Sequence, residues 1–109
     1  MSRTWKGIGA SPGLAEGWVK VLCNPEDPSE IGKETILVCP TASRELVPIL
    51  SRVSGLVTER GGILAIASGW ARELDVPAVV GVGNLLESVK DGDRIRINGL
   101  EGTVELVTL

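Results

Sequence analysis

Three short apolar runs alternate with two amphipathic segments in the middle of the chain. The runs lie at residues 35–39, 55–58 and 77–82, and their unbroken apolar character is typical of strands buried on both faces. Residues 65–74 have the spacing of a helix. Another helix is predicted by apolar side chains at i, i+3, i+4 and i+7, namely Leu46, Ile49, Leu50 and Val53. This order of strands and helices indicates a parallel sheet with right-handed crossovers.

Local signals refine the ends of these elements. Ser43 is a candidate N-cap for the first helix. Pro48 requires that this helix begin late or bend, because proline is tolerated only in a first turn. Residues 59–62 predict a tight turn after the second strand, and Gly69 weakens the second helix without ending it.

The two ends of the chain predict antiparallel pieces. Strands are expected at 5–8 and 17–22, with a turn at 10–13 between them and a surface loop at 24–33. Near the C-terminus, residues 84–87 have the form of a capping box that opens a short helix.

Residues 94–98 alternate as a half-buried strand, and Asn98-Gly99 predicts a hairpin into a further strand at 102–107. No internal repeat interrupts the chain. We therefore expect one α/β domain over residues 1–109, with a βαβαβ parallel core and antiparallel flanking hairpins.

Composition narrows the class of protein. Of 109 residues, 43% are hydrophobic, which is enough for one compact core. The net charge of -3 and the scarcity of aromatic residues, 3% of the chain, give no reason to expect nucleic acid or an anionic membrane as a partner. No apolar run approaches the roughly 20 residues of a membrane helix. Residues 1–6 lack the apolar core of a signal peptide, so a cytoplasmic location is expected.

The sequence contains no histidine. This removes imidazole as a general base, nucleophile, phosphoryl carrier or metal ligand. Cys23 and Cys39 are too few for a structural zinc site without histidine, and we expect neither a metal nor a cofactor. Both cysteines are interpreted as reduced core residues on strands, although their spacing leaves a disulfide between them open.

Three glycine-bearing segments are candidates for ligand contact. Residues 81–84 (GVGN) resemble the start of a dinucleotide-binding fingerprint, but Leu86 stands at the position of its third glycine, so a turn after the strand is the better interpretation. Residues 11–13 predict only a turn. Residues 61–62 are two glycines between a strand and a helix, where backbone amides and the helix dipole favour an anion. On these residues alone, a plain turn is still the better interpretation.

Residues 58–81 (TERGGILAIASGWARELDVPAVVG) resemble the signature of the phosphohistidine, or mobile, domain of phosphoenolpyruvate (PEP)-utilising enzymes. That family includes pyruvate phosphate dikinase, PEP synthase, enzyme I of the sugar phosphotransferase system and rifampicin phosphotransferase. Further family elements are matched in the same order by 11–17 (SPGLAEG), 90–95 (KDGDRI) and 102–104 (GTV). The resemblance implies the swivelling β/β/α fold. The positions that match the main motif are Thr58, Gly61, Gly62, Ala71, Arg72, Pro77 and Gly81.

The chain departs from the family at the position that defines its chemistry. With no gap in the motif, the phosphoryl-accepting histidine of the family falls on Ile66, and the Thr-Ser pair before it falls on Leu64 and Ala65. In the family, that histidine takes a phosphoryl group at one active site and the domain swings to deliver it at another. Isoleucine has no lone pair with which to accept phosphorus. Ser68 lacks an adjacent base, and we interpret it as an ordinary serine on a helix face.

Two explanations of Ile66 are open. In the first, which we favour on sequence alone, the site has decayed and Ile66 packs under its neighbours. In the second, an apolar rim stands where the family presents its reactive group, and a partner docks on it. The rim consists of Ile63, Leu64, Ile66 and Trp70.

The resemblance implies a mobile domain that carries a phosphoryl group between active sites, and the missing histidine predicts that this chain alone is catalytically inactive. A docking or regulatory role is therefore expected, with nucleotide-binding and PEP- or pyruvate-binding domains as partners in cis or trans. The alternatives are an architectural piece of a larger phosphotransferase and a small-anion binding module. The candidate anion-binding residues are Arg60, Gly61, Gly62, Ile63, Leu64 and Ala65.

Overall fold

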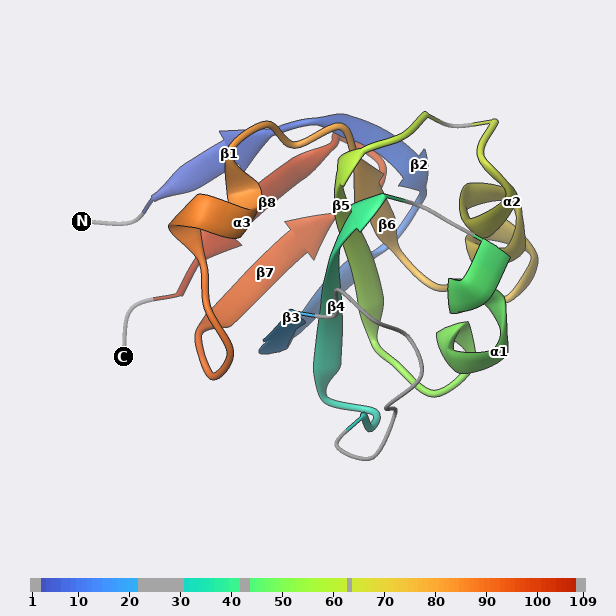
Figure 1. Ribbon diagram of the computed structural model, residues 1–109, viewed down its shortest axis with the longest axis horizontal. Coiled ribbons are helices and arrows are strands. Elements are labelled where there is room, and N and C mark those ends of the chain that lie inside the picture. Colours follow the sequence, from blue (N-terminus) through green and yellow to red (C-terminus); the bar gives the residue numbers. More distant parts are fainter. Residues whose placement is uncertain (1–2, 22–30, 42–43, 63, 108–109) are drawn as a thin grey trace.

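The computed structural model describes residues 3–21, 31–41, 44–62 and 64–107. Its strands are β1 (Thr4–Lys6), β2 (Ile8–Ser11), β3 (Leu14–Val21), β4 (Thr35–Thr41), β5 (Gly55–Arg60), β6 (Ala78–Val80), β7 (Arg94–Asn98) and β8 (Thr103–Leu106). Its helical segments are the 3₁₀ turn η1 (Arg44–Leu46), α1 (Val47–Leu50), α2 (Ile66–Glu73) and α3 (Leu85–Ser88). Helices α1 and α2 lie side by side on one side of the sheet, and α3 lies away from them (Figure 1).

The strands of the described residues form one mixed sheet in the order β1-β8-β7-β3-β4-β5-β6-β2. Strands β3, β4, β5 and β6 are parallel neighbours, and the other pairings are antiparallel. This confirms the predicted α/β fold with a parallel core and antiparallel flanks. The parallel part has one strand more than predicted, because β3 pairs in parallel with β4, Trp18 lying opposite Thr35.

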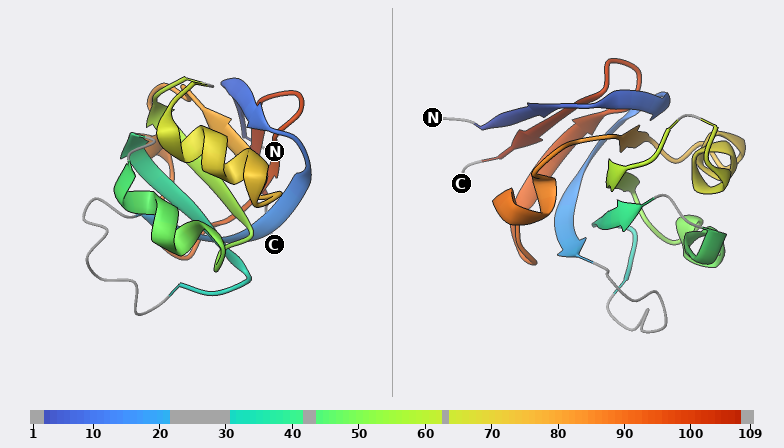
Figure 2. Two further views of the ribbon diagram at one scale, coloured as in Figure 1. Left: turned by 90° about the vertical axis from the view of Figure 1, so that its right-hand side faces the viewer. Right: turned by 45° about the horizontal axis from the view of Figure 1, so that its top comes forward.

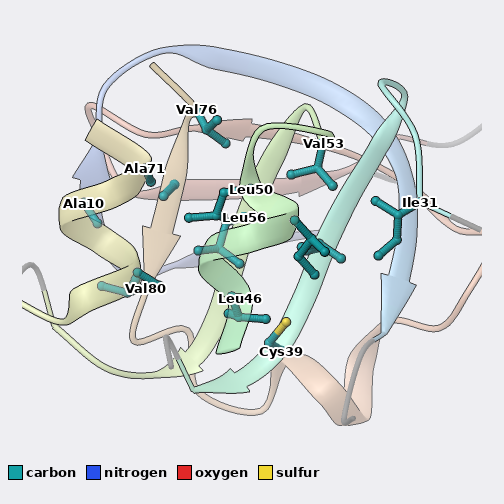
Figure 3. Packing of buried hydrophobic residues seen from close by; sticks show 14 residues of the cluster. Ala10, Ile31, Cys39, Leu46, Leu50, Val53, Leu56, Ala71, Val76 and Val80 are labelled. Carbon is teal, nitrogen blue, oxygen red and sulfur yellow. The ribbon is translucent and has the colours of Figure 1, made fainter. Parts of the chain in front are cut away.

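Two apolar cores lie on opposite faces of the parallel strands. The first is shared with α1 and α2 and includes Leu37 and Leu56 (Figure 3). The second lies between the parallel strands and the antiparallel β7 and β8, and includes Ile36 and Val57. Successive residues of β4 and β5 thus enter different cores, which explains why their sequences are apolar without a break. The result is a β/β/α stack of layers (Figure 2).

The sheet closes on itself through one N-terminal segment. Strand β1 pairs with β8 at one end of the strand order, and β2 pairs with β6 at the other. Only Gly7 separates the two strands, and its amide donates to the carbonyl of Gly102 at 2.7 Å. The sequence predicted a single strand at 5–8 and a turn at 10–13, whereas β2 continues to Ser11. Closure of the ring explains this longer pairing, because a barrel leaves no strand edge open.

The first predicted helix is shorter than its apolar pattern indicated. It consists of the single turn η1 followed by α1, which begins at Val47. Pro48 lies in the first turn of α1, so the late start expected from this proline is confirmed. Leu46 and Val53 still reach the first core from outside α1. The candidate cap Ser43 lies outside the described residues.

The capping box predicted at 84–87 is wrong, although the short helix is present. Asn84 is left-handed, with φ of 63°, and its side chain forms no capping bond. Instead the Leu86 amide donates to Oε2 of Glu59, at the end of β5, at 2.8 Å. A carboxylate at this helix start suits the partial positive charge of the free amides. The cap therefore comes from a strand 27 residues away in sequence.

The predicted C-terminal hairpin is confirmed. Its turn is held by Asn98, whose side-chain oxygen accepts the amides of Leu100 and Glu101, both at 3.0 Å. This is the local bonding that makes asparagine common at turns. Cys39 is 1% exposed in β4, as a strand-borne core residue should be, and Cys23 lies outside the described residues.

Candidate docking site at the start of helix α2

The site begins where β5 ends and the chain turns into α2. Strand β5 extends to Arg60, so the turn predicted at 59–62 is reduced to Gly61 and Gly62. Gly61 has a φ of 120°, a conformation that favours glycine. The buried hydroxyl of Thr58 donates to the carbonyl of Arg60 at 2.7 Å, and the Ala65 amide donates to the carbonyl of Gly62 at 3.0 Å. Backbone carbonyls on both sides of the turn are thus held in place.

Ser68 fixes the same turn from inside. It is 0% exposed, and its hydroxyl donates to the carbonyl of Gly62 at 2.9 Å. The sequence analysis interpreted this residue as an ordinary serine on a helix face. The structure places it on the buried face of α2, with its side chain toward the turn and away from solvent. A hydroxyl that is buried and bonded in this way has a structural role, and phosphorylation of it would require the turn to open.

Ile66 lies on the outside of the first turn of α2. It is 48% exposed, Trp70 one helical turn later is 47% exposed, and Leu64 is 92% exposed. The favoured expectation that Ile66 packs under its neighbours is therefore wrong. The reason lies on the inner face of α2, where the small residues Ala67 and Ala71 are fully buried and let the helix approach the sheet. Ile66 is left on the flank.

These side chains line an open groove of about 470 Å³ along α2. Its lining residues are Leu64, Ala65, Ile66, Gly69, Trp70, Arg72 and Glu73. Sequence reasoning found the apolar members but missed Gly69 and Glu73. The signal was present, because Gly69 stands three residues after Ile66 and Glu73 three residues after Trp70, a spacing that puts each pair on the same side of the helix. Ile63, the remaining member of the predicted rim, lies outside the described residues.

Arg72 anchors α2 to the N-terminal segment. Its guanidinium Nη1 donates to the carbonyl of Ala10 in β2 at 2.8 Å, so this motif residue has a structural bond at the far end of the helix from the turn. Beyond it, Asp75 takes a left-handed φ of 57° and the chain enters β6. Gly81 follows β6 with a φ of 69°, and a side chain there would come within 3.7 Å of the carbonyl oxygen of Gly61. The motif glycines therefore meet at one end of the parallel strands.

The candidate anion-binding residues are only partly gathered. Gly61 and Arg60 are exposed beside the turn, and Ala65, the N-cap of α2, offers no side-chain capping bond. Leu64 projects into solvent next to them. Within the described ranges, no group of three or more His, Cys, Asp or Glu residues is placed to hold a metal ion. No helix in the same ranges has the length and apolar character needed to cross a bilayer.

Comparison with known proteins assigns the family. The family model for the mobile domain of PEP-utilising enzymes matches residues 31–102. A probable PEP synthase of Methanothermobacter thermautotrophicus is 40% identical over 99 residues, which are 91% of this chain and 14% of that protein. Rifampicin phosphotransferase of Bacillus subtilis is 40% identical over 100 residues, 92% of this chain and 11% of that protein.

A solved structure supports the same assignment. The NMR structure of Enzyme I (nEIt) is 32% identical and superimposes with a TM-score of 0.63 over 73% of this chain and 33% of that one. The chain spans only 11% to 14% of the two curated relatives above, so those proteins contain much more than this domain. The extent and specificity of the family match show that this chain belongs to the mobile domains of PEP-utilising enzymes.

Proposed function

We propose that this chain is a mobile domain that docks on partner domains through the α2 groove and does not itself carry a phosphoryl group. The observation that carries the proposal is Ile66, an exposed apolar side chain at the first residue of α2, four residues after Gly62, in a chain without histidine. The sequence motif puts the acceptor of the family at this residue. The turn that would present an acceptor is kept, and an apolar side chain stands in its place.

The two buried hydroxyls that bond to the backbone at the turn do not offer a substitute acceptor. Thr58 and Ser68 are both fully buried, and each donates its proton to a backbone carbonyl of the turn. A phosphoryl transfer to either would need an exposed oxygen and a base to take its proton. Both hydroxyls therefore support the shape of the turn, and neither supports group transfer.

The length of the relatives supports other domains as the surface on which this chain docks. Because proteins that contain this domain are several times longer than the chain, its docking partners are sought in nucleotide-binding and PEP- or pyruvate-binding domains, in cis or in trans. The alternative is an architectural piece of a larger phosphotransferase. Such a piece would lie among the same domains but would not use the groove to dock on them. A cytoplasmic location stays a prediction.

Phosphorylation tests the loss of chemistry. The protein is incubated with PEP, with ATP and with a phosphorylated relay protein, and its intact mass is followed. We expect no acid-labile gain of one phosphoryl group, and a stoichiometric gain would contradict the proposal. The variant Ile66→His is expected to gain phosphate very slowly, because Leu64 and Ala65 replace the hydroxyls of the family motif and a misplaced reacting group costs about 100-fold in rate.

Docking is tested with a relative whose own mobile domain has been removed, such as the B. subtilis rifampicin phosphotransferase. Titration calorimetry with the wild-type chain should give measurable binding, and Trp70→Ala should abolish it because it removes the largest apolar side chain that lines the groove. Arg52→Ala, an exposed residue beyond α1, is the control and should leave binding unchanged. Equal binding by the two variants would exclude the groove as the docking surface.

Weak anion binding is the second candidate function. It is favoured by the open N-terminus of α2, where Ala65 provides no side-chain cap, and by exposed Arg60 nearby. Sulfate or phosphate at millimolar concentration should shift the amide resonances of residues 61–65. Shifts confined to distant residues would leave the turn with a structural role only.

A further inference from the structure

One N-terminal segment covers both ends of the sheet. This strap consists of β1, Gly7 and β2. Thr4 lies opposite Glu105 on β8, and Ile8 lies opposite Val80 on β6. The strap crosses from one edge strand to the other and completes the ring (Figure 1). Its release would expose a row of unpaired backbone groups on each of two strands, which is a template for another strand.

The surface on which the strap lies accommodates only a strand with glycines at fixed positions. A side chain on Gly7 would lie 2.6 Å from the Val82 side chain, and one on Gly9 would lie 2.7 Å from the carbonyl oxygen of Leu100. On the opposite side, a side chain on Gly102 would lie 2.7 Å from the strap backbone at Gly7. Ordinary side chains cannot approach so closely. The segment that fits this surface is therefore the strap itself, from the same copy of the chain or from a second copy.

Only part of the strap is packed against the cores. Thr4, Lys6 and Ile8 are exposed, Trp5 packs partly buried against the second core, and Ala10 and Ser11 are buried. The buried hydroxyl of Ser11 finds no hydrogen-bond partner, which costs stability at the one polar side chain that the strap buries. Backbone pairing, Trp5, Ala10 and the bond from Arg72 to the Ala10 carbonyl attach the strap. A segment of this kind opens more readily than the apolar core.

The hinge is short. Only Pro12 and Gly13 connect the strap to β3, and Gly13 has a φ of 131°. Proline holds its own φ near −65°, which also suits an extended chain, and glycine has free access to extended conformations. The hinge can thus straighten without steric cost. Short hinges favour exchange of an element between copies, because they restrict its return to its own chain.

We propose that two copies of this chain exchange their straps and form a reciprocal dimer. Each strap then pairs with β8 and β6 of the partner, so the strand pairings of the monomer are kept. The hinge changes its conformation, and with it the bond from the Gly99 amide to the Gly13 carbonyl, 2.8 Å in the monomer. Since the strand pairings are the same, the equilibrium depends on protein concentration: the monomer prevails in dilute solution, and the exchanged dimer grows in after refolding at high concentration.

Two chains with one introduced cysteine each test the exchange directly. One carries Thr4→Cys and the other Glu105→Cys, both with Cys23→Ser, while Cys39 remains because it is buried. Opposed residues of an antiparallel pair have the Cα separation that a disulfide needs. After the two chains are refolded together at high concentration and oxidised, intact mass should detect the mixed disulfide dimer. Within a monomer neither cysteine has a partner.

Two controls decide the outcome. Thr4→Cys refolded with Arg52→Cys, which is exposed and unrelated to the strap, should give no mixed dimer. Three residues, Gly-Ser-Gly, inserted between Pro12 and Gly13 should abolish the dimer because the strap then returns to its own chain, whereas the same insertion after the exposed Gly83 should not. Absence of the mixed dimer, an equal yield with Arg52→Cys, or an equal yield with the longer hinge would each overturn the proposal.

Discussion

Replacement of Ile66 by alanine separates the two explanations of the apolar groove. If the site has decayed and the side chain is part of the core, the fold loses stability. If the side chain belongs to a docking surface, the fold is nearly unaffected and only binding is lost. Ile97 provides a matched control, because it is the same residue type at 0% exposure in the second core.

The magnitude follows from the exposed fraction. Full burial of an isoleucine contributes about 1.5–3 kcal/mol, so Ile66, at 48% exposure, accounts for roughly half of that. Alanine has the better helix propensity and returns roughly 0.4 kcal/mol. We therefore expect Ile66→Ala to lower the free energy of unfolding by about 1 kcal/mol or less. Ile97→Ala should lower it by about 2–5 kcal/mol, since a cavity remains.

Urea unfolding followed by tryptophan fluorescence measures both variants. Because Trp70 lies beside Ile66 in the groove, the midpoint and slope of the transition are compared, and the absolute intensity is not. The reasoning would be refuted by a loss for Ile66→Ala as large as that for Ile97→Ala. It would also be refuted if docking on the partner domains survived Ile66→Ala undiminished.

Four further substitutions test single interactions. Glu59→Gln should cost about 1 kcal/mol in urea unfolding, because the neutral amide caps α3 without a charge. Asp75→Gly should stabilise the protein by about 0.5–1 kcal/mol in the same assay by relieving the left-handed φ of 57°. Ser11→Ala should leave stability unchanged or higher, because the buried hydroxyl has no partner. Hydrogen bonds from Arg94, and then from Arg96, lower the pKa of Glu16. A carboxyl whose pKa is lower in the folded state stabilises it above the pKa of the unfolded chain and loses this effect as pH falls through the folded value. Glu16→Gln should therefore flatten the acid side of the stability profile measured by thermal unfolding.

The parts of the fold that depend on local sequence patterns could be predicted from the sequence. Strands β4 and β5 were found because both of their faces are buried, which leaves an unbroken apolar run. The hairpin after β7 was found because Asn98 bonds to its own turn. Closure of the ring could not be predicted, because the partners of β1 and β2 lie about 70 to 100 residues away and their pairing depends on backbone approach at glycines.

The position of the site was predicted from the sequence, but the exposure of Ile66 was not. The paired glycines located the turn, yet whether Ile66 faces the sheet or the solvent depends on which side of α2 approaches β2. Two fully buried alanines, at 67 and 71, decide this, and their four-residue spacing was visible in the sequence. The apolar side chain of Ile66 suggested that it is buried. The small side chains of the two alanines were the better indication of which face of α2 packs on the sheet.

If the proposed function is right, this chain has lost the chemistry of its family and kept the shape of the site, and the bonds of the turn explain how. The turn before α2 is held by the Thr58 hydroxyl, the Ser68 hydroxyl and the positive φ of Gly61, and none of these interactions involves the side chain at Ile66. Under the proposed function, a change at that outward position would remove a reactive group without disturbing the turn. Helix α2 then presents an apolar side chain at its first residue, with Trp70 beside it, and the same scaffold would offer a surface for contact in place of a site for transfer.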